Sequence, residues 1–111
     1  MPKTIDRNEL KRRLDSGEDI KLIEVLKEDE YKRLHIRGAM NIPLATIGAT
    51  AREKFSKDDF IVVYCSDINC TASPTAAEKL ESFGFTNVHD YAEGKADWHE
   101  AGYPMEGTDA S

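Results

Sequence analysis

One segment restricts the fold more than any other, because an apolar strand leads directly through a short loop into a helix. Residues 59–65, DFIVVYC, contain five consecutive β-forming or aromatic residues with little polar alternation. This pattern predicts a strand that is covered on both faces, as in a parallel sheet. Residues 73–84, SPTAAEKLESFG, carry a proline in the first turn of a predicted helix and a glycine at its end, as helices often do.

Strand-like and helix-like segments alternate along the rest of the chain. Extended segments are predicted over residues 20–26, 38–44 and 87–91, and helices over residues 4–15, 27–35, 45–55 and 93–102. Asp6 is a candidate cap of the first helix. The alternation predicts a three-layer α/β fold with a central, mostly parallel sheet flanked by helices on both sides.

The length and composition fit one globular domain. The chain has 111 residues, of which 40% are hydrophobic and 32% are charged, so it can bury a single core and does not have the composition of a disordered chain. We expect the domain to span residues 1–105 and a flexible tail to span residues 106–111.

The charge and hydropathy of the chain exclude two classes of partner. The net charge is −6, whereas nucleic-acid binding needs a basic face, so no nucleic-acid partner is expected. No apolar run approaches the roughly 18 residues of a membrane span, and residues 1–10 contain no apolar signal-peptide core. These features predict a cytoplasmic protein without a membrane partner, in a compartment where thiols are normally kept reduced.

The two cysteines of the chain, Cys65 and Cys70, stand at the two ends of one short loop. Cys65 ends the predicted strand of residues 59–65, and ligands bind at the carboxyl ends of the strands in open α/β sheets. The N–H groups at the start of the next helix favour negative charge, so a thiolate there should have a pKa below the usual value of about 8.5. The residues alone leave two interpretations open, a nucleophile held in an anion-binding loop and an inert buried cysteine.

Three motifs in the right order resemble a known family. Residues 35–43 read HIRGAMNIP, residues 61–65 read IVVYC, and residues 83–104 read FGFTNVHDYAEGKADWHEAGYP. Over residues 3–105 the chain resembles the single-domain rhodaneses, and in particular variants with a Cys-x4-Cys loop. The resemblance implies a sulfurtransferase with the α/β fold described above and without a metal or organic cofactor.

The resemblance also implies a role for each part of the loop. Cys65 would accept sulfane sulfur from a small donor, which is thiosulfate, a persulfide or a polysulfide. It would pass the sulfur to a thiol or cyanide-like acceptor, or to a partner protein. The residues expected to cradle the persulfide are Ser66, Asp67, Ile68, Asn69, Cys70 and Thr71.

The loop departs from the family pattern in its charge. Many members carry an arginine five residues after the cysteine, where this chain has Cys70. A cysteine does not replace the bidentate fork of an arginine, and Asp67 adds a negative charge, so we expect weak use of thiosulfate. Arg37 is a candidate cation for the rim of the site. Leu26, two residues after Glu24, replaces a family arginine, which should weaken an ion-pair network at the edge of the sheet.

Cys70 has two possible roles. It could resolve the persulfide by attacking Cys65 and forming a disulfide, which needs Cα atoms about 4.4–6.8 Å apart. Alternatively, it is a small loop residue that packs inward and is never oxidised.

The remaining candidate side chains are expected to be structural. The two thiols do not have the usual zinc spacing, and His35, His89 and His99 are scattered, so no metal site is expected. We expect His35 to stabilise the fold, the other two histidines to lie at the surface, and Trp98 to lie in the core.

Three functions compete at this point. The first is the sulfurtransferase with Cys65 as the sulfur carrier. The second is a non-catalytic binding module or thiol redox sensor with the same fold. The third is a phosphatase or arsenate reductase, which we rank lowest because such enzymes hold a tetrahedral oxyanion with a longer loop that ends in arginine.

Overall fold

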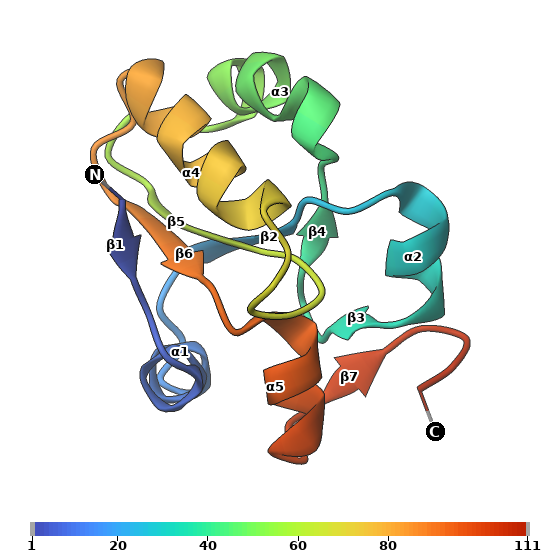
Figure 1. Cartoon of the computed structure of the whole chain (residues 1–111). Helices are drawn as coiled ribbons and strands as arrows, with labels where there is room; N and C mark the ends of the chain where they lie inside the picture. Colours follow the sequence, from blue (N-terminus) through green and yellow to red (C-terminus); the bar gives the residue numbers. More distant parts are fainter. Residues whose placement is uncertain (1, 111) are drawn as a thin grey trace.

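The structure, a computed structural model, describes residues 2–110, and its centre is a five-stranded parallel sheet (Figure 1). The strand order is β1-β6-β5-β2-β4, and every neighbouring pair is parallel. The five strands are β1 (Lys3–Thr4), β2 (Ile20–Glu24), β4 (Met40–Asn41), β5 (Phe60–Tyr64) and β6 (Val88–Tyr91).

Helices cover both faces of this sheet, which confirms the predicted three-layer α/β fold (Figure 1). On one face lie α1 (Arg7–Asp15) and α5 (Gly94–Glu100), and on the other lie α3 (Ile47–Lys54) and α4 (Ala72–Ser82). The short helix α2 (Glu28–Arg33) lies beside a second, antiparallel sheet of β3 (His35–Ile36) and β7 (Met105–Glu106), and the 3-10 turn η1 (Leu44–Thr46) precedes α3.

Strand β5 is buried on both faces, as its apolar sequence predicts. Its residues alternate between the two core clusters, with Ile61 and Val63 facing α3 and α4, and Val62 and Tyr64 facing α1 and α5. All four side chains are fully buried. The strand therefore ends in the middle of the molecule and delivers the next residue, Cys65, to the carboxyl edge of the sheet.

The predicted elements are confirmed where they are long, and three two-residue strands were missed. Strands β1, β3 and β7 are too short to show a period in the sequence. The first helix begins at Arg7, after Asp6 accepts the N–H of Glu9 at 2.8 Å as a cap. In α3, Gly48 is required by packing, because the ring of Phe83 fills the space where a Cβ atom would stand.

The end of the chain packs against α2. Glu106 belongs to β7, so the predicted domain boundary at residue 105 falls inside a strand. Farther along, Thr108 N–H donates to Lys32 O at 3.0 Å and Asp109 N–H donates to Arg33 O at 2.8 Å. The mobility of the tail stays a prediction. Residue 1, where the predicted domain begins, and residue 111, where the predicted tail ends, lie outside the described residues.

Among residues 2–110, no helix is both long enough and apolar enough to cross a membrane.

Candidate functional site

Cys65 leaves the end of β5 and is fully buried in the core cluster beneath α4. The loop that follows turns outward, and Ile68 at its tip is 57% exposed. It then returns to Cys70, which is partly buried and forms a disulfide with Cys65 across a Cα–Cα distance of 6.4 Å. This distance lies within the range that a disulfide requires, so the two thiols that the sequence places at the ends of the loop meet in the structure.

Asp67 organises the outer part of the loop. Its carboxylate accepts the N–H of Asn69 at 3.0 Å, and its carbonyl oxygen accepts the N–H of Cys70 at 3.1 Å. Two N–H groups of the predicted anion cradle are therefore used inside the loop. Thr71 is the N-cap residue of α4 and makes no side-chain cap, so its role in the cradle stays a prediction, as does that of Ser66.

The start of α5 holds the inner part of the loop. Lys95 N–H donates to Cys65 O, and Ala96 N–H donates to Ser66 O, both at 2.9 Å. These bonds satisfy N–H groups that the first turn of a helix leaves free. Gly94 makes the approach possible, since its φ is +73° and a Cβ atom there would lie 2.7 Å from Cys65 O.

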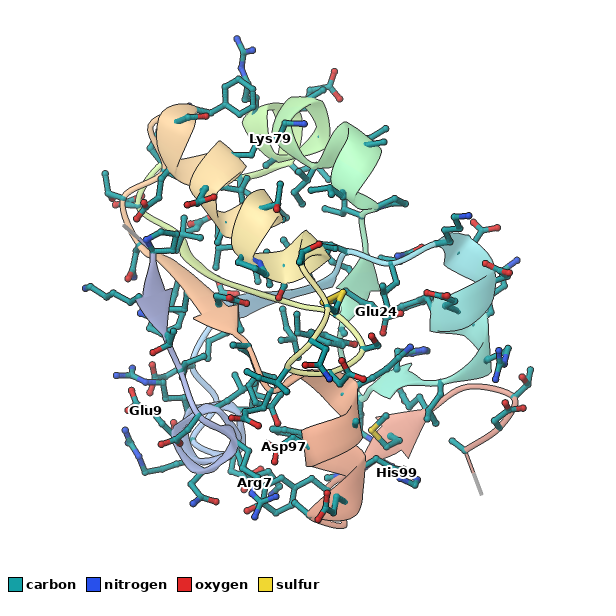
Figure 2. The ribbon with its side chains drawn as sticks, in the orientation of Figure 1. Arg7, Glu9, Glu24, Lys79, Asp97 and His99 are labelled. Carbon is teal, nitrogen blue, oxygen red and sulfur yellow. A yellow bond between two sulfur atoms is a disulfide. The ribbon has the colours of Figure 1, made fainter. Side chains whose placement is uncertain are left out.

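A buried ion pair lies beside this anchor. The Glu24 carboxylate is fully buried, and its Oε2 atom lies 3.1 Å from Lys95 Nζ; Figure 2 shows Glu24 between the sheet and α2. Lys95 also donates to Leu34 O at 2.7 Å and Glu30 O at 3.4 Å. Burial raises the pKa of Glu24, and the charge of Lys95 opposes that rise.

This ion pair supplies a cation at the edge of the sheet, and the weakening expected from Leu26 stays a prediction. Lys95 supplies a cation to Glu24 from a different element, α5, which lies 71 positions away in the sequence. No local pattern indicates this contact, because a lysine in an amphipathic helix normally points to solvent.

A second buried carboxylate, Asp90, lies on the opposite face of the sheet. It is 6% exposed and stands on β6 opposite Val63. Its Oδ1 atom and the fully buried hydroxyl of Ser73 have no hydrogen-bond partner that meets distance and angle criteria within residues 2–110. Burial raises the pKa of Asp90, whereas the nearby Ser73 hydroxyl lowers it. Neither residue was predicted as part of the site.

Two surface cavities lie beside the end of β2, and one of them also borders the cysteine loop. One of about 510 Å³ has mainly apolar walls, including Leu26, Pro43 and Leu44. The other, of about 290 Å³, contains Ser66 and Lys95 in its walls. Leu26 and Glu30 line both cavities.

Arg37, the predicted rim cation, does not lie beside the cysteine loop. Its N–H donates to Pro104 O at 3.1 Å, and its guanidinium lies 4.0 Å from Glu106. It lines cavities with Pro104 and with His99 or Trp98, which belong to the C-terminal part of α5, whereas the loop contacts the start of that helix. The pairing of β3 with β7 places it there, whereas Lys95, whose backbone N–H donates to Cys65 O, directs its ammonium group to Glu24.

The histidines are separate from the site. His35 stacks on Tyr31 and its Nδ1 atom lies 2.6 Å from Tyr31 O, in agreement with a structural role, and His99 is exposed. The expectation that His89 lies at the surface was wrong, because it is 9% exposed and stacks on Phe60. Trp98 lies in the core as predicted.

Within residues 2–110, no group of three or more histidine, cysteine or acidic side chains is arranged to hold a metal ion.

The fold and the loop define a class of protein, namely small α/β domains that present a cysteine at the carboxyl end of the central parallel strand. The family model for the rhodanese-like domain matches residues 6–101. The chain belongs to the rhodanese-like domain family, and its Cys-x4-Cys spacing agrees with the loop variant identified from the sequence.

Three curated relatives support the assignment and differ in their names. A 102-residue match at 35% identity is to an HTH-type transcriptional regulator of Mycobacterium tuberculosis, covering 92% of this chain and 44% of the relative. An 88-residue match at 30% identity is to the putative sulfur carrier protein YrkF of Bacillus subtilis, covering 79% and 46%. A 91-residue match at 30% identity is to a putative mitochondrial thiosulfate sulfurtransferase of Schizosaccharomyces pombe, covering 71% and 63%. The chain thus spans less than half the length of the first two relatives.

Solved structures give the same fold. A rhodanese-like domain from Anabaena sp., determined by NMR in solution, superposes with a TM-score of 0.88 at 31% identity. The superposition covers 98% of this chain and 82% of that one. The chain is therefore a rhodanese-like domain with sulfur carrier and sulfurtransferase relatives.

Proposed function

We propose that this chain is a sulfurtransferase in which Cys65 carries sulfane sulfur as a persulfide and Cys70 resolves it. The observation that carries the proposal is the disulfide between these residues, which joins a buried thiol at the end of β5 to a thiol at the loop's other end. The family and the relatives named as a sulfur carrier and a sulfurtransferase support the same chemistry.

In the first step, the Cys65 thiolate attacks the outer sulfur of a persulfide or polysulfide donor. A sulfur–sulfur bond forms at Cys65 while the donor's own sulfur–sulfur bond breaks, and the donor leaves as a thiolate with the electron pair. The start of α4 favours the thiolate and the anionic persulfide. No external oxidant or reductant is needed in this step.

In the second step, the sulfur leaves Cys65 in one of two ways. An external nucleophile takes the outer sulfur and regenerates the Cys65 thiolate. Alternatively, the Cys70 thiolate attacks the Cys65 Sγ atom, forms the disulfide and releases hydrosulfide. The sulfane sulfur is then reduced and the two cysteines are oxidised, and an external thiol reductant must restore both thiols before the next turnover.

The charge of the loop favours persulfides and polysulfides over thiosulfate. The loop contains no arginine or lysine, and the Asp67 carboxylate is held inside it by the N–H of Asn69. A dianion therefore meets a loop that carries a carboxylate and lacks the bidentate cation of many relatives. We expect thiosulfate to react more slowly than a persulfide donor.

Intact-mass analysis tests the proposal. The chain is reduced, separated from the reductant, and incubated with thiosulfate or with a low-molecular-weight persulfide. Wild type should gain one sulfur atom, and Cys65→Ser should gain none. Cys70→Ser should keep the sulfur longer than wild type and release less sulfide. Failure of both wild type and Cys70→Ser to gain sulfur from any donor would overturn the carrier role, and an equal persulfide lifetime in Cys70→Ser would overturn the resolving role.

A thiol redox sensor is the second candidate, because one relative is named as a transcriptional regulator and the two thiols form a disulfide here. A sensor would convert between dithiol and disulfide without passing sulfur to an acceptor. Repeated transfer of sulfur to a small thiol, counted as turnovers per protein molecule, separates the two functions. A sensor would transfer no sulfur to the acceptor, whereas a sulfurtransferase supplied with reductant would turn over repeatedly.

A further inference from the structure

A charged cavity of about 290 Å³ opens beside the cysteine loop, between α2 and the end of the chain. Ser66, the residue that follows the buried Cys65, forms part of its wall, so the cavity borders the first residue of the cysteine loop. The volume is near the lower limit of the roughly 300–1,000 Å³ that small-molecule sites usually have. A molecule of amino-acid size fits this space better than a protein segment does.

The walls of this cavity offer both signs of charge. Arg33 lies at its outer edge, where its Nε atom donates to Asp109 at 3.2 Å, and its side chain is 69% exposed. A guanidinium carries five N–H donors, so this bond leaves its terminal nitrogens to bind a carboxylate. Glu30 lies on the same wall, and its carboxylate forms no ion pair among the described residues.

The inner end of the cavity is fixed and not available to a charged ligand. Lys95 Nζ is held by Glu24 and by two carbonyl oxygens of the α2–β3 segment, and its side chain is 13% exposed. The lining therefore has one accessible cation at Arg33 and one unpaired carboxylate at Glu30. A dianion such as thiosulfate finds no net positive field here, whereas a zwitterion finds a partner for each of its charges.

We propose that this cavity binds the amino-acid head of a low-molecular-weight thiol or persulfide, with its carboxylate on Arg33 and its ammonium on Glu30. The sulfur of such a ligand would then point past Ser66 toward Cys65. This inference rests on the proposed function and specifies its substrate class. Free cysteine and glutathione share the α-amino-carboxylate group, so both sources fit the recognition chemistry.

Arg37 provides a matched control, because it is also an arginine, is 67% exposed and lies near a carboxylate, yet it lines other cavities. Three reduced proteins are compared, namely wild type, Arg33→Gln and Arg37→Gln. The measured quantity is the rate constant for gain of sulfur from cysteine persulfide, glutathione persulfide and inorganic polysulfide. Polysulfide has neither a carboxylate nor an ammonium group.

Arg33→Gln should slow the reaction with cysteine persulfide about tenfold, because it removes a charge-assisted bond, and should leave the polysulfide reaction near the wild-type rate. Arg37→Gln should match wild type with every donor. Slowing with glutathione persulfide as well identifies the shared head group as the recognised part, and slowing with cysteine persulfide alone identifies free cysteine as the source. Equal slowing with polysulfide, or no slowing in Arg33→Gln, would overturn the proposal.

A binding measurement separates this proposal from the sulfurtransferase function. S-methylcysteine has the same head group but donates no sulfane sulfur, and its binding is followed by NMR shifts of the amides of residues 30–34 and 66. Binding that is lost in Arg33→Gln and kept in Arg37→Gln supports the cavity even if no sulfur is transferred by any donor. Sulfur transfer without S-methylcysteine binding would retain the function and overturn the cavity assignment.

Discussion

Glu24 and Asp90 occupy the two strands that flank β5, one on each face of the sheet, and both carboxylates are buried. Glu24 is paired with a lysine from α5, whereas Asp90 has only the hydroxyl of Ser73 beside it. Burial raises the pKa of both groups. On the α5 side of the sheet, an ion pair between Glu24 and Lys95 stabilises the region next to the cysteine loop. On the α4 side, the Asp90 carboxyl group has no such cation beside it among residues 2–110.

The difference matters because a buried charge is destabilising unless it is paired and hydrogen-bonded. At Glu24 the ion pair, the α5 anchor on Cys65 and the cavity wall all depend on one segment, Gly94 to Ala96. At Asp90, burial disfavours the charged form and raises the pKa of the carboxyl group. The two groups should therefore respond in opposite ways to neutralisation.

The largest effect should follow from breaking the pair at Glu24. Lys95→Met leaves the buried carboxylate without its cation and should lower the free energy of unfolding at pH 7 by about 3–5 kcal/mol. Urea denaturation measures this change. The double variant Glu24→Gln/Lys95→Met should recover part of the loss, because no unpaired charge remains.

The pH dependence of Lys95→Met gives a second test of that comparison. A carboxyl group with a raised pKa in the folded state stabilises the fold below its unfolded pKa, about 4.3 for Glu, and loses that stability as pH rises through the folded pKa. Lys95→Met should therefore become more stable relative to wild type as pH falls from 7 toward 5. A constant difference over this range would show that Glu24 is not the source of the effect.

The next effect should come from the glycine that brings α5 to the loop. Gly94→Ala places a Cβ atom 2.7 Å from Cys65 O at a φ of +73°, and a residue held in such a conformation costs roughly 1–3 kcal/mol. Gly102→Ala is the control, since its φ is +76° but nothing lies within 4 Å of the added atom. Thermal unfolding of both should show the larger loss in Gly94→Ala. Similar losses would mean that the close contact with the loop adds nothing to the backbone strain.

Elements with a strong local sequence pattern were predicted, whereas elements that depend on contacts between distant residues were not. The long strand before Cys65 and the helix after it have strong local patterns, and both were predicted to within a few residues. The loop was located from that order alone. Strands β3 and β7 exist only through their pairing with each other, and no two-residue segment shows a period.

The electrostatic part of the site was largely missed, for a physical reason. The contact between Lys95 and Glu24 joins residues 71 positions apart, and burial of Asp90 depends on the packing of α4 over β6. Arg37 was chosen because it is a cation near a family motif, but β-pairing places it at the distant end of α5. The identity of a charged residue is visible in a sequence, whereas its partner is fixed only by the fold.

Neutralising Asp90 should have a smaller effect, of the opposite sign. Asp90→Asn keeps the shape of the side chain and removes a buried charge, so it should raise the free energy of unfolding at pH 7 by roughly 1 kcal/mol. Because the folded pKa of Asp90 is raised, wild type should lose stability as pH rises from the unfolded value of about 3.9 toward the folded one. The variant should lack this part of the pH profile. Destabilisation by Asp90→Asn would show that the ionised carboxylate has a partner that stabilises it.

The smallest effect should come from Ser73, and it tests whether the hydroxyl is the only support of Asp90. Ser73→Ala removes a hydroxyl that lowers the pKa of Asp90 and so favours its ionised form, and it should lower the free energy of unfolding at pH 7 by about 0.5–1 kcal/mol. The same change made in Asp90→Asn should have a smaller effect, because an amide gains less than a carboxylate from a nearby hydroxyl. A double-mutant cycle in urea measures the difference between the two. If Ser73→Ala lowers the free energy of unfolding equally in wild type and in Asp90→Asn, Ser73 acts by packing under α4. Glu24 would then be a paired buried carboxyl group, and Asp90 a buried carboxyl group without support from a side chain.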